Sequence, residues 1–166
     1  MSTNSMTPWL QSRLSALYEA PDDDAFQKAF DRAFSSTCEM RLDHAAQRLE
    51  YFRADLDSRR IACKNTTVRW ENLTSTSDEP DKASAPSVVA GSLVVTRFLP
   101  FRIRASPAQR NSHINFSAKI EQEVTAQADE QGDRHRITSF YYTSVDSTPP
   151  IHLSVPRAAK NSDIEK

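Results

Sequence analysis

Two charged residues in apolar surroundings, Asp43 and Arg97, are the sequence's candidates for chemistry. Arg97 lies between Val95 and Phe98, and burying a guanidinium without a partner costs free energy. We therefore expect Arg97 either to pair with an acid such as Glu71 or Asp43, or to face the carboxylate or enolate of a ligand. Asp43 would act as a general base if a cavity raised the pKa of its carboxyl group. The alternative role for Asp43 is to cap the N-terminus of a helix.

The sequence contains none of the common catalytic or metal-binding signatures. It has only two glycines, and it lacks a G-x-S-x-G, a P-loop, an H-E-x-x-H and a paired-glycine fingerprint. The histidines stand at positions 44, 113, 135 and 152, a spacing that does not indicate a metal site. Cys38 and Cys63 are too few for a disulfide scaffold. The sequence therefore predicts neither a metal nor a cofactor.

Length and charge restrict the class of protein. A chain of 166 residues, 38% of them hydrophobic, is long enough for one domain with its own core. The formal net charge of -1 provides no overall field toward nucleic acid or a membrane, so we expect neither partner. Residues 1–13 lack the apolar core of a signal peptide, and no run approaches the roughly 18 apolar residues of a membrane helix. We expect an intracellular, cytoplasmic protein.

Helical periodicity dominates the first third of the chain. A helix is predicted from Thr7 to Pro21, where proline ends it, and a second one begins at the acidic run 22–24. A third helix is predicted from Asp43 to about residue 60, with Asp43 as its N-cap. The buried stripes of these three helices are Leu10, Leu14 and Leu17; Phe26, Phe30 and Phe34; and Ala45, Leu49, Phe52 and Leu56.

Strand periodicity dominates the rest. A short strand is predicted at 35–43, and longer ones at 62–73, 88–105, 114–124 and 136–145. The run 88–105 would reach about 60 Å if straight, so we expect it to bend at Gly91 and to carry a bulge near Pro100. The segments 106–112 and 126–133 are predicted to be connections.

Helices that precede a series of strands favour the α+β class. We predict three N-terminal helices packed on one face of a strongly curved antiparallel sheet. The expected boundaries are a disordered N-terminus at 1–6, a single domain at 7–146 and a loosely ordered tail at 147–166.

The order of elements resembles a known superfamily of cone-shaped α+β domains. The resemblance lies in RLSALYEAPDDDAFQKAFDRAF, at 13–34, which has the helix, acidic break and aromatic-ended helix of that pattern, and in CEMRLDH, at 38–44, in the place of its first strand. The superfamily contains nuclear transport factor 2, ketosteroid isomerase, scytalone dehydratase and the SnoaL-like polyketide cyclases. The resemblance covers 8–146 and is closest to uncharacterised fungal members.

This resemblance implies a cavity between helices and sheet, a half-barrel that relatives use for isomerisation, dehydration or cyclisation. Others use the outer sheet face to dimerise. Asp43 matches the position of the general-base aspartate in members similar to ketosteroid isomerase. The oxyanion tyrosine of those isomerases aligns with Arg13 rather than Tyr18, so that feature is not reproduced.

Three functional hypotheses follow from the resemblance. The first is a homodimeric cone domain, paired through its outer sheet face, that holds a small hydrophobic ligand. The second is a cofactor-free lyase or isomerase with Asp43 as base and Arg97 or Tyr18 stabilising an enolate. The third is a protein-interaction module. The residues expected to line a ligand cavity are Tyr18, Phe30, Phe52, Trp70, Phe116 and Tyr141.

Overall fold

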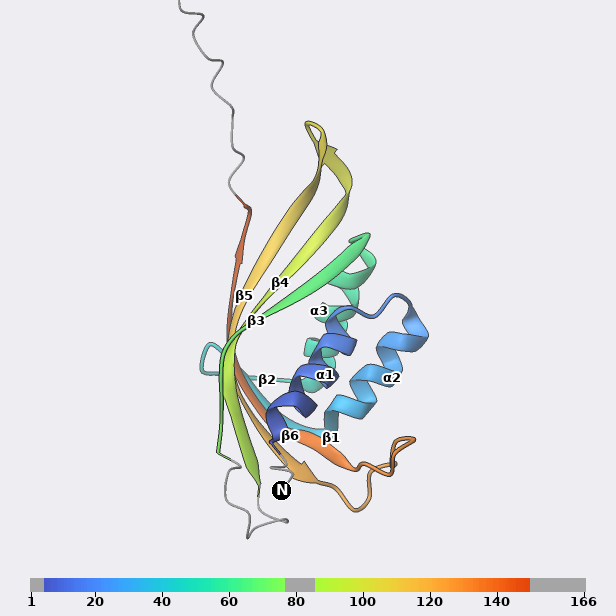
Figure 1. Cartoon of the computed structure of the whole chain (residues 1–166), viewed down its shortest axis with the longest axis vertical. Coiled ribbons are helices and arrows are strands. Elements are labelled where there is room, and N and C mark those ends of the chain that lie inside the picture. Colours follow the sequence, from blue (N-terminus) through green and yellow to red (C-terminus); the bar gives the residue numbers. More distant parts are fainter. Residues whose placement is uncertain (1–4, 77–85, 150–166) are drawn as a thin grey trace, which may run out of the picture.

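Three helices lie on one face of a six-stranded, strongly curved sheet (Figure 1). The computed structural model describes residues 5–76 and 86–149. The elements are α1 (Met6–Tyr18), α2 (Asp23–Ala33), β1 (Phe34–Leu42), β2 (Ala45–Gln47), α3 (Leu49–Ile61), β3 (Asn65–Ser75), β4 (Ser87–Ile103), β5 (Ser106–Gln122) and β6 (His135–Ser147). The expected α+β class, with the helices segregated to one side of the sheet, is confirmed.

The first two helices follow the sequence prediction. Leu10, Leu14 and Leu17 of α1 are all buried, as their spacing indicated. Asp22 caps α2, because its side chain accepts a hydrogen bond of 2.8 Å from the backbone N–H of Ala25. The two aspartates that follow place negative charge at the positive end of the helix dipole.

The predicted start of the third helix is wrong. α3 begins at Leu49, and its N-cap, Arg48, lies five residues after the expected N-cap, Asp43. Asp43 instead lies with His44 in the two-residue turn between β1 and β2, and both have positive φ, 51° and 68°. Two left-handed residues are what a type I′ hairpin turn requires, and aspartate tolerates that conformation better than most residues.

The sheet is mixed and open. Its strand order is β2-β1-β6-β5-β4-β3. All neighbours are antiparallel except β1 and β6, which run parallel, whereas we expected a wholly antiparallel sheet. Along the chain, α3 and the four strands β2, β3, β4 and β5 separate β1 from β6. A parallel pair needs a long connection.

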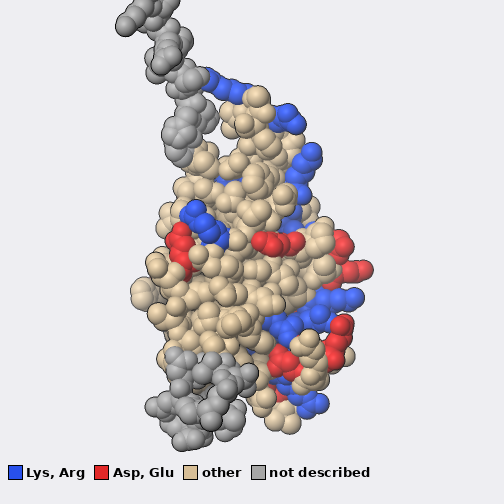
Figure 2. Space-filling model, viewed as in Figure 1, with Lys and Arg blue, Asp and Glu red and all other residues tan. Residues whose placement is uncertain are grey.

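The β4–β5 hairpin is longer than predicted. Residues 106–112, expected to form a connection, are the first part of β5, and the turn is limited to Arg104 and Ala105. The two strands of 17 residues therefore project beyond their neighbours (Figures 1 and 2). The bulge near Pro100 is confirmed, since the register shifts between Phe98 and Arg102. Gly91 allows close approach of β3: a Cβ there would lie 2.5 Å from Leu73 Cδ2.

Aromatic side chains fill the space between the helices and the sheet. Phe34 and Phe140 lie at its centre with ring centroids 5.6 Å apart, edge to face. Phe52 of α3 packs on both rings, and Phe116 of β5 stacks on Phe140 at 5.7 Å. All four side chains are at least 95% buried. Phe30 of α2 stacks on Phe34 with ring centroids 5.1 Å apart, so the core joins α2, α3 and the middle of the sheet.

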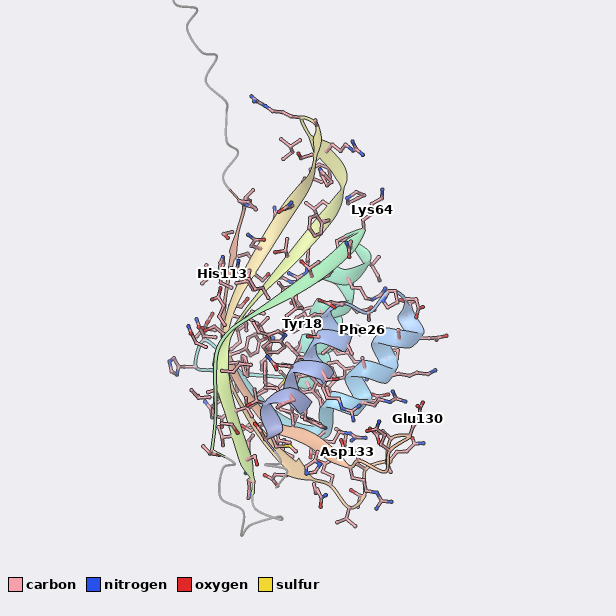
Figure 3. All side chains as sticks on the ribbon, viewed as in Figure 1. Tyr18, Phe26, Lys64, His113, Glu130 and Asp133 are labelled. Atoms are coloured by element: carbon pink, nitrogen blue, oxygen red, sulfur yellow. The ribbon has the colours of Figure 1, made fainter. Side chains whose placement is uncertain are left out.

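A group of polar contacts, which we call the latch, joins α1 to the β5–β6 connection. Figure 3 labels two residues of this connection, Glu130 and Asp133. The Asp133 carboxylate accepts hydrogen bonds from Trp9 Nε1 at 2.6 Å and Arg13 at 3.1 Å. It also lies 2.6 Å from His135 Nδ1. Arg13 bridges to Asp129 in the same connection. This latch fixes the connection 123–134 against α1.

Parts of the predicted boundaries lie outside the described residues. The predicted disordered start includes 1–4, and the predicted loose tail includes 150–166, neither of which is described. The single-domain limits of 7–146 stay a prediction.

We predict that Phe140→Ala lowers the free energy of unfolding by about 3–5 kcal/mol, because it removes a ring that four other aromatic residues contact. Urea unfolding followed by circular dichroism measures the loss. Tyr51→Ala, at a side chain that is 64% exposed, is the control and should change stability by less than about 1 kcal/mol. Equal effects of the two substitutions would contradict this account of the core.

We predict an acid-dependent contribution of the latch to stability. Burial opposes the ionisation of Asp133, but the hydrogen bonds from Trp9, His135 and Arg13 outweigh burial and lower its pKa from 3.8 to about 2. A lowered folded-state pKa stabilises the fold fully above about 3.8, and this contribution disappears as the pH falls through about 2. At pH 6, Asp133→Asn should cost about 1–2 kcal/mol. The difference from wild type should shrink between pH 4 and pH 2 in urea titrations, and a pH-independent difference would count against the latch.

Candidate functional site

Arg97 is the buried charge from which the candidate site is built. It lies on β4, on the same face as Leu93 and Val95, because alternate residues of a strand share a face. Only 8% of its surface is exposed. Its Nη1 donates a hydrogen bond of 2.8 Å to the Ser112 hydroxyl, which β5 presents from the neighbouring strand. The arginine therefore faces the interior of the cone, toward the helices.

A chain of polar groups continues from Arg97 to α3. The Ser112 hydroxyl donates to Asp146 Oδ1 at 2.6 Å, and Arg59 donates to Asp146 Oδ2 at 2.9 Å. Arg59 also bonds to Asp55 at 3.0 Å. The chain contains two cations and two anions, so its formal charges cancel. The prediction that Arg97 pairs with Glu71 or Asp43 is wrong, because Arg97 is linked to an acid, Asp146, only through the hydroxyl of Ser112.

Burial shifts the pKa values of the chain. It lowers the pKa of Arg97, and repulsion from Arg59 lowers it further. Burial also raises the pKa of the Tyr18 hydroxyl, which lies in the interior near Arg97. Burial opposes the ionisation of Asp146, but hydrogen bonds from Ser112 and Arg59 stabilise its carboxylate. The pKa of Asp146 therefore falls below the ordinary value. At neutral pH Arg97 and Asp146 are charged and Tyr18 is protonated.

A very small cavity separates Tyr18 from Arg97. Its volume is about 10 Å³, and Thr66 and Leu56 are among its lining residues. A cavity of this size holds about one water molecule. In the structure as it stands, this end of the interior has no room for an apolar metabolite.

The structure brings five of the six predicted ligand-lining residues to the interior. Phe30, Phe52 and Phe116 belong to the aromatic core and fill the space that we expected to be a cavity. Trp70 packs on Phe116 and donates a hydrogen bond of 3.1 Å to the hydroxyl of Ser15 in α1. Tyr18 lines the small cavity next to Arg97.

The sixth residue, Tyr141, does not belong to this set. It is 41% exposed, beneath the guanidinium of Arg41, on the opposite side of the sheet. Residues 140 and 141 are neighbours on a strand, and since Phe140 points into the core, Tyr141 must point away from it.

Asp43 and Arg97 are not in contact. The Asp43 side chain is exposed in the β1–β2 turn, and its backbone N–H bonds to the carbonyl of Tyr142. Sequence reasoning missed Ser112 and Asp146, because 112 fell in a predicted connection and 146 at the end of the predicted domain. The shared parity of Ser112, Ile114 and Phe116 was the available signal.

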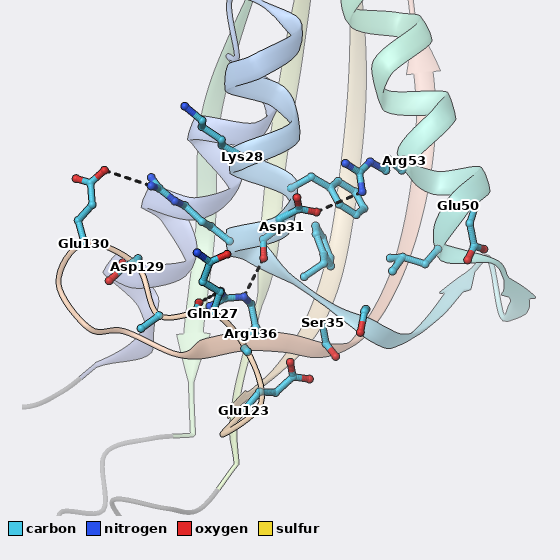
Figure 4. Close-up of a pocket in the computed structure, with 17 residues that line it drawn as sticks. Lys28, Asp31, Ser35, Glu50, Arg53, Glu123, Gln127, Asp129, Glu130 and Arg136 are labelled. Atoms are coloured by element: carbon cyan, nitrogen blue, oxygen red, sulfur yellow. Dashed lines mark hydrogen bonds and ion pairs between the residues drawn. The ribbon is translucent and has the colours of Figure 1, made fainter.

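A larger cleft of about 860 Å³ lies between α2, α3, the start of β1 and the β5–β6 connection (Figure 4). Several of its charged side chains already have partners. Arg53 pairs with Asp31, and Arg136 donates to the backbone carbonyls of Asp31 and Gln127. The lining mixes acids and bases and does not favour a ligand of either charge.

Within residues 5–76 and 86–149, no three His, Cys, Asp or Glu side chains are placed to hold a metal ion. No helix in these segments is long and apolar enough to cross a membrane.

Comparisons with known proteins identify the fold. Neither a protein-family model nor a curated protein sequence matches the chain. Among solved structures, Candida albicans Mtr2 matches 89% of this chain and 98% of its own, with a TM-score of 0.57 and 11% identity. The CaMKII hub of S. rosetta matches 87% and 99%, with a TM-score of 0.55 and 10% identity.

The hexachlorocyclohexane dehydrochlorinase LinA, type 2, matches 90% of this chain and 90% of its own, with a TM-score of 0.54 and 10% identity. These neighbours have the nuclear transport factor 2-like fold. The resemblance drawn from the helix pattern at 13–34 is therefore confirmed at the level of the fold.

We predict that Ser112→Ala lowers the free energy of unfolding by about 1–3 kcal/mol, because it leaves the buried Arg97 without its hydrogen-bond acceptor. Ser58→Ala, at an exposed serine of α3, is the matched control and should be close to neutral. Thermal and urea unfolding measure both. Near-equal stability of the two variants would mean that the chain of polar groups contributes nothing to the fold.

Proposed function

Starting from its nuclear transport factor 2-like cone fold, we propose that this chain is a non-catalytic domain that works by pairing with a second copy of itself. The contact surface is the outer face of the sheet, on the side away from the helices. The neighbours named above include both a hub and a dehydrochlorinase, so the fold alone does not decide between assembly and catalysis.

The filled interior is the observation that carries this proposal. A cone that binds a metabolite needs a cavity of roughly 300 Å³ or more. Here the rings of Phe34, Phe52 and Phe140 occupy the centre, and the cavity beside Arg97 has a volume of about 10 Å³. The cleft of about 860 Å³ between α2 and α3 is larger than this, but nine of its 17 lining residues are charged. The small apolar ligand that the resemblance implied therefore lacks support from the geometry.

The outer face has a centre of small residues. Asn115 pairs across the sheet with Ser92 and Thr143, and Ser117 pairs with Tyr141. Small side chains allow two sheets to approach to about 10 Å. A shallow hollow of about 380 Å³, lined by Ser117 and Tyr141 among others, lies on this face and would accept a side chain of the second copy.

Charge does not oppose self-association on this face. Its ion pairs are Glu39 with Arg41, Arg69 with Glu71, and Lys119 with Glu121. Each joins one acid to one base, so a second copy meets no excess of like charge, and like charges facing each other would cost several kcal/mol. Tyr141 and Val145, 41% and 65% exposed, add apolar surface.

The area is also sufficient. Five strands about 4.8 Å apart, each about eight residues long at about 3.3 Å per residue, give a flat face of about 600 Å² before side-chain relief is counted. A stable interface buries about 800 Å² of accessible surface per partner. Close packing of the two sheets would therefore give an interface of the usual size.

The lyase or isomerase alternative has one supporting feature: Tyr18 and Arg97 line the same small cavity and could stabilise an oxyanion. It also requires Asp43 as the base, and the Asp43 carboxylate is exposed on a turn.

We predict that the purified protein with Asp43→Asn keeps the stability and assembly state of the wild type.

We predict that, in analytical ultracentrifugation at protein concentrations of about 10–100 μM, the purified wild-type chain sediments as a dimer. The Ser117→Arg variant should sediment as a monomer. The arginine would place a long charged side chain at the centre of the interface. Gln27→Arg, at an exposed position of α2, adds the same charge on the helical side and should stay dimeric. A monomeric wild type at these concentrations would exclude the proposal, as would a dimer that Ser117→Arg leaves unchanged.

A further inference from the structure

We propose that the tip of the β4–β5 hairpin binds the surface of an anionic phospholipid membrane. The part concerned is residues 99–110, which we call the arm. It extends past the last residues with which the neighbouring strands pair: β3 reaches Phe98, and β6 reaches Asn111. Among the described strands, none other than the two of the hairpin pairs with the arm. Figure 1 shows it projecting from the body.

The arm carries charge of one sign. It contains Arg102, Arg104 and Arg110, and the sequence has no aspartate or glutamate between Asp81 and Glu121. Figure 2 shows basic groups without acidic ones on the projecting part in this view. The chain as a whole has a net charge of -1, so the acids are concentrated on the rest of the molecule. The complementary partner of the arm is therefore an anion.

The arm also exposes apolar side chains at its end. Phe101 is 55% exposed and Ile103 is 39% exposed. The register of the hairpin pairs Ile103 with Ser106 and Arg102 with Pro107, so Phe101 and Ile103 share one face while Arg102 occupies the other. Arg104 lies in the turn between the strands. The tip is thus an apolar pair surrounded by arginines.

The length of the arm separates the tip from the acidic body. About five residues on each strand, at about 3.3 Å per residue, give a reach of roughly 15 Å. The Debye length is about 8 Å at physiological ionic strength, so an anionic surface at the tip is largely screened from the acids of the body. The arm is long enough for a flat surface to contact the tip without touching the helices.

The chemistry of the tip fits lipid better than nucleic acid or a peptide. Single-stranded nucleic acid is bound in basic grooves with several aromatic stacking platforms. The tip has one aromatic ring, an isoleucine and two prolines, Pro100 and Pro107. The clefts described above contain no residue of the arm, so a helical or proline-rich peptide has no groove to bind there. A bilayer needs only apolar groups to insert and cations beside its head groups.

The test is sedimentation of the purified full-length protein with vesicles of phosphatidylcholine alone and of phosphatidylcholine with 30% phosphatidylserine. We expect binding to the anionic vesicles at least ten-fold tighter than to the neutral ones. Raising the salt from 0.1 M to 0.5 M should release the protein, because each basic residue near an anionic surface strengthens binding roughly five-fold through a screened interaction.

Two pairs of substitutions locate the contact. Arg102→Glu with Arg104→Glu should abolish binding, and Phe101→Ser with Ile103→Ser should weaken it at least ten-fold. The matched controls are Lys28→Glu with Arg48→Glu, which reverses two charges on the body, and Tyr51→Ser with Val124→Ser, which removes two apolar side chains that are 64% and 83% exposed. All of these positions are exposed, so the variants should keep the wild-type circular dichroism spectrum.

The proposal is wrong if the wild type binds both kinds of vesicle equally or neither, or if the controls weaken binding as much as the arm variants do. A competition experiment with a 20-nucleotide single-stranded oligothymidine covers the other anionic partner. Release of the protein from anionic vesicles by stoichiometric oligonucleotide, with tighter binding to the oligonucleotide, would also overturn it. Failure to dimerise would not affect this test, because the tip lies outside the body of the sheet.

Discussion

The packing of Phe34, Phe52 and Phe140 is the constraint on which the rest of this structure depends. The three rings come from β1, α3 and β6, which are far apart in the sequence but meet at the centre of the cone. Their contact holds the helices against the concave face of the sheet and fixes how far α3 can stand from it. Because the rings fill this space, the interior is a core with one small polar end rather than a binding chamber.

That polar end follows from the same packing. Arg97 occupies a position on β4 that the inner-face alternation assigns to the interior, where an isolated charge would be costly. The cost is offset through Ser112, whose hydroxyl accepts from Arg97 and donates to Asp146, while Arg59 of α3 holds the other carboxylate oxygen. The charge on β4 is thereby linked to α3. The chain of polar groups positions this helix, and this structural role explains the buried arginine without a ligand.

Periodicity in the sequence predicted the helices α1 and α2, the long strands and the bulge near Pro100, because each rests on a local alternation of apolar and polar residues. The cone fold came from the resemblance to a known superfamily. The prediction failed where one residue suits two kinds of local structure. Asp43 is equally suited to an N-cap and to a left-handed turn, and the three residues of β2 have no alternation that would distinguish them. Ser112 and Asp146 meet only through strand pairing, which a single sequence does not reveal. Tyr141 was predicted to line the cavity but lies on the outer face of the sheet, because the sequence alone did not show how β6 pairs with its neighbours.

Net charge was the weakest of the sequence-based arguments. A total of -1 indicates no attraction to an anionic surface, yet it averages an acid-free segment of 39 residues, positions 82–120, with an acidic remainder. Screening makes the average irrelevant at a tip that stands roughly 15 Å from the body, because charges beyond one Debye length contribute little to the local potential. The fold, by extending β4 and β5 past their neighbours, separates the two populations of charge in space. The electrostatics of this chain must therefore be judged surface by surface: neutral on the outer sheet face, compensated inside the cone, and basic on the arm.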